Sequence, residues 1–171
     1  PTVTVGQDGR VLVFWHAGVG DDASRSMYLA TSNNGGAAFE PVRRVSTSTF
    51  GACGCCSPAA ITDAAGTIYL SYRGASDNVQ RGQRLMTIGK MGETLSDKMI
   101  HPWQINGCPV STTTLSVSLR GTRVAWETQG QVYFADVTQL NAAVSPQGVA
   151  RHRRKNPAIA TNTQGETLLA W

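Results

Sequence analysis

The four cysteines are the side chains in this sequence most able to do chemistry, and they gather in two short segments. Three lie in Cys53-Gly54-Cys55-Cys56 and the fourth is Cys108, in Gly107-Cys108-Pro109. Such thiols can form disulfides in an oxidising compartment, bind a metal as thiolates, or stay inert and buried. We favour disulfides, with one of the first three cysteines joined to Cys108. A four-thiolate site for zinc or copper stays open, although Cys-x-Cys-Cys is not the Cys-x2-Cys spacing of common zinc sites.

A second group of candidate residues follows the strand that ends at Tyr72. It places two cations, one carboxylate and one amide close together in sequence, in Arg73, Asp77, Asn78 and Arg81. Guanidinium groups bind carboxylates through charge-assisted hydrogen bonds, so these four residues are candidate ligands for an anionic sugar. The same composition also suits a loop that is ordered by its own Asp–Arg pairs and Asn turns.

Three further features can be read as functional or as ordinary surface. Asp21 and Asp22 could supply a general acid or ligands for a hard cation, but we expect them to be solvated. His16 ends a strand in the position equivalent to Arg73, and we expect a hydrogen-bonded structural role. The basic run at residues 151–155 could bind an acidic polymer, yet it has no interleaved aromatic residues, so a nucleic acid partner is not expected.

The composition favours strands as the elements that position these residues. The chain has 171 residues, of which 41% are hydrophobic, only 15% are charged and 18 are glycine, with a net charge of +4. Abundant Gly, Ser and Thr with few charges are typical of short strands joined by tight turns. No apolar run approaches the 18 or so residues that a membrane-spanning helix needs, so we expect no membrane span.

One phrase recurs along the chain, with proline first, glycine eight positions later and an aromatic residue six positions after that. Its copies are Pro1…Gly9…Trp15, Pro58…Gly66…Tyr72 and Pro157…Gly165…Trp171, and a looser copy runs from Thr113 through Gly121 to Trp126. Each copy predicts a β-hairpin whose glycine occupies the turn. The four aromatic residues hold a fixed place in the repeat, so we expect them to pack between repeating units rather than to bind ligands.

The repeat predicts an all-β fold, a β-propeller of four-stranded antiparallel blades. The blades are expected at about residues 1–57, 58–112 and 113–156, with the start of the next at 157–171. A β-sandwich also has short strands, but it gives no reason for the phrase to return. Propellers need at least about four blades, so we expect the chain to be one partial propeller domain, from a longer chain or a larger complex.

The turn Ser32-Asn33-Asn34-Gly35-Gly36-Ala37-Ala38-Phe39 resembles the Asp box of sialidases and related bacterial neuraminidase repeat propellers. Asn34 stands where that motif has Asp, and Ala38 where it has Thr. The resemblance implies a complete ring of six blades. It also implies hydrolysis of terminal sialic acids by an arginine triad, a Tyr nucleophile with its Glu, and an Asp acid/base. The Phe/Tyr-Arg-Ile-Pro phrase of the first arginine is absent, and no Tyr–Glu pair can be assigned.

The expected function is therefore that of a secreted or periplasmic sialidase-like propeller that binds a glycan or a partner protein. Two alternatives stay open. One is an exo-acting glycoside hydrolase whose catalytic residues lie largely outside this segment, which leaves enzymatic activity undecided. The other is a metal-binding subunit that uses Cys53, Cys55, Cys56 and Cys108. No cofactor is expected, apart from zinc or copper at these cysteines.

Overall fold

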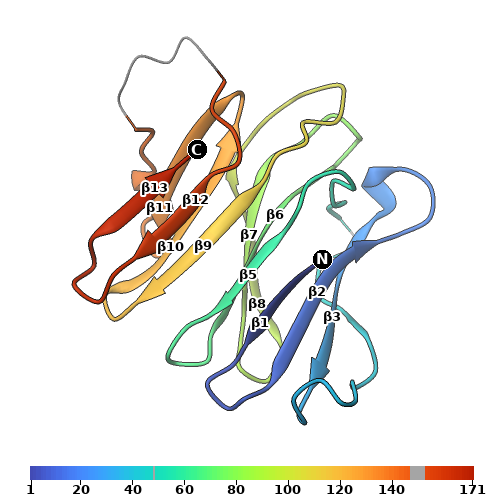
Figure 1. Ribbon diagram of the computed structural model, residues 1–171. Coiled ribbons are helices and arrows are strands. Elements are labelled where there is room, and N and C mark those ends of the chain that lie inside the picture. Colours follow the sequence, from blue (N-terminus) through green and yellow to red (C-terminus); the bar gives the residue numbers. More distant parts are fainter. Residues whose placement is uncertain (48, 147–152) are drawn as a thin grey trace.

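The computed structural model describes residues 1–47, 49–146 and 153–171, and their regular structure is almost entirely β-strand. The strands form four antiparallel sheets that follow one another along the chain (Figure 1). The first sheet has the order β1-β2-β3-β4, with strands Thr2–Val5, Val11–Ala17, Ser26–Ser32 and Arg43–Arg44. The second has the order β5-β6-β7-β8, with strands Ala59–Thr62, Ile68–Arg73, Gln83–Ile88 and Thr94–His101.

The third and fourth sheets are smaller. The third has the order β11-β10-β9, with strands Thr113–Ser118 (β9), Gly121–Thr128 (β10) and Gln131–Asp136 (β11). The fourth pairs β12 (Ala158–Thr161) with β13 (Thr167–Ala170). The prediction of an all-β antiparallel fold is confirmed. The expectation of four strands in the third unit is not met in the described residues, where a single bridge between Phe134 and Val144 stands in for the fourth strand.

Each sheet begins at a copy of the repeated phrase, which forms the hairpin of its first two strands. The phrase glycine has a positive φ in all four copies, 123° at Gly121 in the looser copy and 79° at Gly9, 84° at Gly66 and 88° at Gly165 in the other three. In each of these last three turns the glycine N–H donates to the carbonyl oxygen three residues earlier. A side chain would make this left-handed backbone costly, so glycine is the residue that the turn requires.

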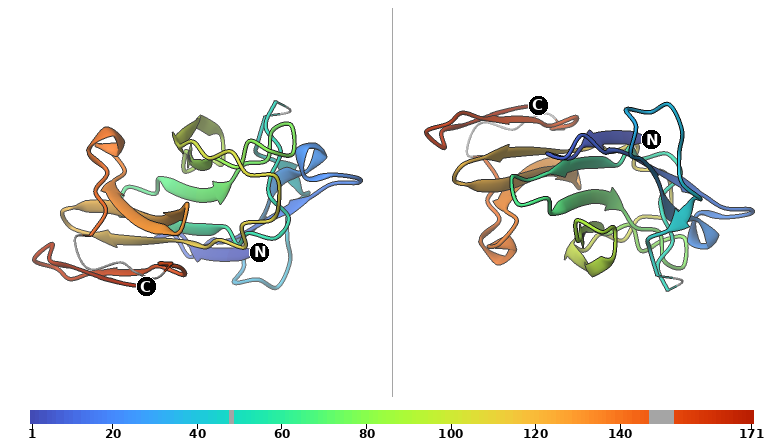
Figure 2. Two further views of the ribbon diagram at one scale, coloured as in Figure 1. Left: turned by 90° about the horizontal axis from the view of Figure 1, so that it is seen from above. Right: turned by 90° about the horizontal axis from the view of Figure 1, so that it is seen from below.

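The four sheets lie side by side in chain order, with the blue N-terminal sheet and the red C-terminal sheet at opposite ends of the row (Figures 1 and 2). The first strands of neighbouring sheets contact each other, β1 with β5, β5 with β9 and β9 with β12. A hydrogen bond of 3.2 Å between the hydroxyls of Thr4 and Thr62 joins the first two of these strands. The phrase therefore supplies both the hairpin of each sheet and the strand that meets the next sheet.

The main core lies between the first two sheets. Alternate residues of β2, β3, β6 and β7 are fully buried there and form one cluster that includes Leu12, Phe14, Met27, Leu29, Ile68, Leu70, Met86 and Ile88. Alternation is what a strand requires, since successive side chains point to opposite faces. Burying one such side chain contributes about 1.5–3 kcal/mol, so this cluster fixes the two sheets against each other.

The aromatic residues of the phrase follow the expectation only in part. Tyr72 and Trp126 are fully buried, as expected of residues that pack between units. Trp15 is partly buried and stacks on Tyr28 with ring centroids 6.1 Å apart. The expectation is wrong for Trp171, which is 50% exposed, with the Arg154 guanidinium 5.0 Å from its ring.

The turn after β3 is held by side-chain hydrogen bonds around Asn34. Its Oδ1 accepts from the Ser32 hydroxyl at 2.9 Å and from the Ala38 backbone N–H at 2.9 Å. The Ser32 oxygen in turn accepts from the Gly36 N–H at 2.9 Å. An amide oxygen thus provides the acceptor for which the resembling motif uses a carboxylate.

Two short 3-10 turns, Asp22–Ser24 and Leu140–Ala142, are the helical elements of the described chain. Neither has the length or the apolar character that a membrane-spanning helix requires.

Candidate functional site

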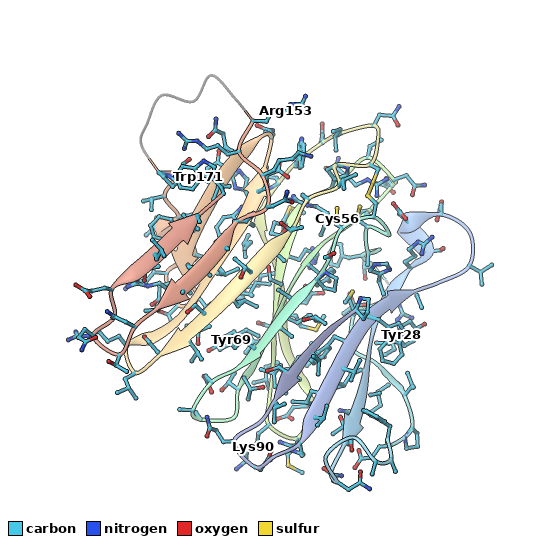
Figure 3. The ribbon with its side chains drawn as sticks, in the orientation of Figure 1. Tyr28, Cys56, Tyr69, Lys90, Arg153 and Trp171 are labelled. Atoms are coloured by element: carbon cyan, nitrogen blue, oxygen red, sulfur yellow. A yellow bond between two sulfur atoms is a disulfide. The ribbon has the colours of Figure 1, made fainter. Side chains whose placement is uncertain are left out.

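Most of the candidate residues lie at one end of the sheets, where loops connect one sheet to the next. Figure 3 shows Cys56 and Arg153 toward this end and Lys90 at the opposite end, among hairpin turns. The phrase positions three titratable residues here, because His16, Arg73 and Glu127 each follow the aromatic residue of a copy. We call this end the loop face.

Cys55 and Cys108 form a disulfide, with their Cα atoms 6.4 Å apart. It joins the loop before β5 to the loop before β9 and so spans the second sheet. The prediction that one of the first three cysteines bonds to Cys108 is confirmed. Cys53 and Cys56 are free and buried, and their Sγ atoms lie 3.2 Å apart.

The two free thiols have different pKa values because one donates a hydrogen bond to the other. Cys53 donates to the Sγ of Cys56, which also accepts from the backbone N–H of Ser111 at 3.4 Å and from its hydroxyl at 3.5 Å. The hydrogen bond from Cys53 lowers the pKa of Cys56 to about 6, against the opposing effect of burial. The same hydrogen bond, together with burial, raises the pKa of Cys53. Cys56 is therefore the thiolate of the pair near neutral pH.

We expect alkylation of Cys56 in the folded protein to follow a titration curve with its midpoint near pH 6. The thiolate is the nucleophile, so the reaction is slow below this pH and fast above it. The measurement is the iodoacetamide reaction rate at Cys56 across pH, followed by peptide mass spectrometry. Cys53→Ala removes the donor and should move the midpoint upward. A parent midpoint at the ordinary thiol value of about 8.5 would contradict this assignment.

Arg73 ends β6 and is only 2% exposed. Its guanidinium donates to four neutral oxygens, namely Ser111 Oγ at 3.1 Å, the Arg81 carbonyl at 2.9 Å, Thr128 Oγ1 at 3.3 Å and the Glu127 carbonyl. Among the described residues it forms no ion pair with a carboxylate. The Trp103 ring centroid lies 5.1 Å from the guanidinium carbon. Arg73 thus connects the second sheet to the segment just before β9 and to the end of β10, the middle strand of the third sheet.

Arg81 is 7% exposed and forms an ion pair with Asp22. Asp22 also pairs with Arg25 at 3.0 Å and accepts from the Gly54 N–H at 3.1 Å. Burial alone would raise the pKa of Asp22, but the hydrogen bonds from Arg81 and Gly54 lower it. The expectation of a merely solvated Asp22 is wrong, because the loop before β5 folds back over this carboxylate.

The neighbouring residues of these loops are also held by internal contacts. Asn78 donates to Asp21 at 2.7 Å and accepts from the Ala23 N–H at 3.1 Å. Asp77 is exposed and adopts φ 49° beside Asn78 at φ 58°. The structure thus brings Asn78 and Arg81 together with the Asp21–Arg25 loop and gives Arg73 a separate buried position. Ligand binding by Arg73, Asp77, Asn78 and Arg81 stays a prediction.

His16 does not have the full set of hydrogen bonds that we expected. It is partly buried, and its Nδ1 is buried with no hydrogen-bond partner among the described residues. Burial lowers its pKa, so the imidazole is neutral at neutral pH.

A pocket of about 320 Å³ opens on the loop face beside the disulfide. Its lining includes Trp103, Cys108, Pro109, Glu127, Gln129, Arg153 and Lys155. Glu127 is 1% exposed, and its Oε1 accepts from the Gly130 N–H at 2.9 Å. Its Oε2 is buried and has no hydrogen-bond partner in the described structure. Lys155 Nζ donates to the Pro109 carbonyl at 3.1 Å. We call this the Trp103 pocket.

Sequence reasoning missed both Trp103 and Glu127. Trp103 is the one tryptophan of the chain that stands outside the repeated phrase, so packing between units does not account for it. Glu127 occupies the same position after the phrase as Arg73, which was singled out. Of the basic run at 151–155, Arg153 and Lys155 line the pocket, and residues 151 and 152 lie outside the described residues.

A larger hollow of about 640 Å³ lies at the opposite end of the sheets, among residues that include Asp8, Arg10, Arg43 and Lys90. Its lining contains no aromatic ring, and none of its residues has a buried polar atom without a partner. Arg10 pairs with Asp8 at 2.7 Å, and Arg43 donates to the Gly92 carbonyl at 3.2 Å. The larger volume is therefore a gap between charged hairpin turns.

No protein-family model matches the chain, and no curated protein matches it significantly. Among solved structures it is similar to the Hadza microbial sialidase Hz136, with a TM-score of 0.61 and 15% sequence identity. The similarity covers 98% of this chain and 38% of that one, so the chain spans well under half the length of this sialidase. At this identity the likeness concerns the fold, and the chain therefore has a sialidase-like all-β fold.

Proposed function

We propose that the four sheets are consecutive blades of a sialidase-like β-propeller and that the Trp103 pocket binds a carbohydrate. Adjacent first strands, meander sheets and a new sheet at each phrase are what propeller blades require. The disulfide is compatible with an oxidising compartment, so we propose a secreted or periplasmic location.

The observation that carries the binding proposal is the Oε2 of Glu127, which has no hydrogen-bond partner among the described residues and belongs to a side chain in the lining of the Trp103 pocket. A buried carboxylate oxygen without a donor costs free energy, and a sugar hydroxyl would supply that donor once a small rotation of the Glu127 side chain turns Oε2 into the pocket. An aromatic ring and a few convergent polar groups are typical of small-molecule sites. Trp103 gives a sugar ring an apolar face, and Arg153 and Lys155 give an acidic substituent cations to pair with.

Binding is better supported than hydrolysis. A sialidase-type site needs arginines that are free to grip the substrate carboxylate, whereas the donors of Arg73 are occupied by four protein oxygens and Arg81 by Asp22. Within the described residues no tyrosine hydroxyl is hydrogen-bonded to a glutamate, and none lines the Trp103 pocket. The contacts of the described residues therefore favour binding over hydrolysis.

The test is calorimetric titration with sialyllactose and, for comparison, neutral lactose. We expect the acidic sugar to bind more tightly, and Trp103→Ala to weaken its binding by about tenfold, or ~1.4 kcal/mol, through loss of the ring contact. Trp171→Ala is the matched control, because Trp171 is half exposed and does not line the pocket. Equal affinity of parent and Trp103→Ala would overturn the site. Turnover of a fluorogenic sialoside by the chain would overturn the non-hydrolytic role.

A further inference from the structure

The second feature of the loop face is the pair of thiols that the disulfide leaves free. Cys53 and Cys56 are buried, their Sγ atoms are 3.2 Å apart, and two residues separate them in the sequence. Taken as a whole, the run has the spacing Cys-x-Cys-Cys, which differs from that of Cys-x2-Cys metal sites. With Cys55 bonded to Cys108, the two remaining thiols do have the Cys-x2-Cys spacing.

The number of available sulfurs decides which ion fits. The Sγ atoms of Cys53, Cys55 and Cys56 all lie within 4.8 Å of one another, but Cys55 is held in the disulfide. Structural zinc sites use four protein ligands, and this group offers two thiolates. Copper(I) is a soft ion that thiolates select, and two of them are enough to hold it. The disulfide therefore disfavours zinc and leaves a low-coordinate site.

The charged groups around the thiol pair also favour a monovalent ion. Arg73 is a buried cation without a carboxylate partner among the described residues. Ser111 links it to the thiols, because the Ser111 hydroxyl accepts from Arg73 Nε at 3.1 Å and lies 3.5 Å from Cys56 Sγ. Two thiolates around a monovalent ion leave one net negative charge, and the Arg73 guanidinium can balance that charge at short range.

We propose that Cys53 and Cys56 form a two-thiolate site for copper(I), covered by the Cys55–Cys108 disulfide. A metal–sulfur distance of about 2.3 Å allows the two sulfurs to stand at most roughly 4.6 Å apart, so the pair opens from its present contact by small side-chain rotations. Protons still carried by the thiols are released as the ion binds. The site does not depend on the Trp103 pocket or on carbohydrate binding.

The experiment is an oxygen-free titration of the protein with copper(I) in competition with bicinchoninate. The protein is first reduced until two cysteines per chain can be alkylated after unfolding, which shows that the disulfide is intact. We expect one copper per chain and X-ray absorption that reports two sulfur neighbours. Cys53→Ser and Cys56→Ser should each weaken copper binding by about 100-fold or more. Ser57→Ala, an exposed substitution in the same loop, should leave it unchanged.

Three outcomes would overturn the proposal. They are loss of all copper to bicinchoninate, a sulfur count of three or four, and undiminished binding by the Cys53→Ser and Cys56→Ser variants. Circular dichroism shows whether each variant is folded. If both variants are unfolded, the copper stoichiometry and the sulfur count of the parent protein decide the question without them.

Discussion

Replacing Arg73 by methionine is expected to lower the free energy of unfolding by about 3–5 kcal/mol. The guanidinium is buried and donates to oxygens of Ser111, Arg81, Thr128 and Glu127. Methionine fills most of the volume but leaves these acceptors without a donor, and a buried unsatisfied polar group costs about 1–3 kcal/mol. The measurement is urea unfolding followed by tryptophan fluorescence.

Two variants sharpen this prediction. Arg73→Lys should recover little of the loss, because a single ammonium cannot match the fork of donors that reaches both sheets. Arg10→Ala removes an arginine from a more exposed ion pair with Asp8 and should cost at most about 1 kcal/mol. If Arg73→Met were as stable as Arg10→Ala, the proposed role of Arg73 in joining the second and third sheets would be wrong.

Removing the disulfide with Cys55→Ser/Cys108→Ser is expected to lower the free energy of unfolding by a similar amount. The bond closes a loop with a sequence separation of 53. The restriction of the unfolded chain by a loop of this length is worth about 4 kcal/mol. Thermal unfolding and urea unfolding of the variant and the parent measure the difference.

Reductant provides the matched control for the disulfide prediction. Adding it should lower the stability of the parent to that of the double variant and should leave the double variant unchanged. A parent that loses no stability on full reduction, with its four thiols counted by alkylation, would show that the bond does not constrain the unfolded chain as proposed.

The sequence predicted the antiparallel hairpins of the sheets because the residues that specify each hairpin lie close together in the chain. Proline, glycine and an aromatic residue at fixed spacing specify a hairpin, and the glycines at Gly9, Gly66 and Gly165 have the positive φ that such turns require. The third sheet departed from the expected four strands because the residues after β11 form a 3-10 turn and a single bridge. No repeated residue marks that segment.

The site was less predictable because it depends on contacts between distant loops. The disulfide partner of Cys108 could be narrowed to one of three cysteines, but only the folded loop selects Cys55. Arg73 looked like a surface ligand, yet the third sheet buries it, and no local pattern reports such burial. The sequence did not indicate Glu127 and Trp103 as site residues, because the pocket that they line is formed by three loops that are distant in the chain.

The amide of Asn34 has a consequence for the conditions that the protein can tolerate. The Asn34 amide oxygen is a neutral acceptor and takes up no proton between neutral pH and mild acid. Its hydrogen bonds from the Ser32 hydroxyl and the Ala38 N–H therefore do not depend on pH in that range. The outer hairpin of the first sheet is thus held by contacts that acid leaves intact.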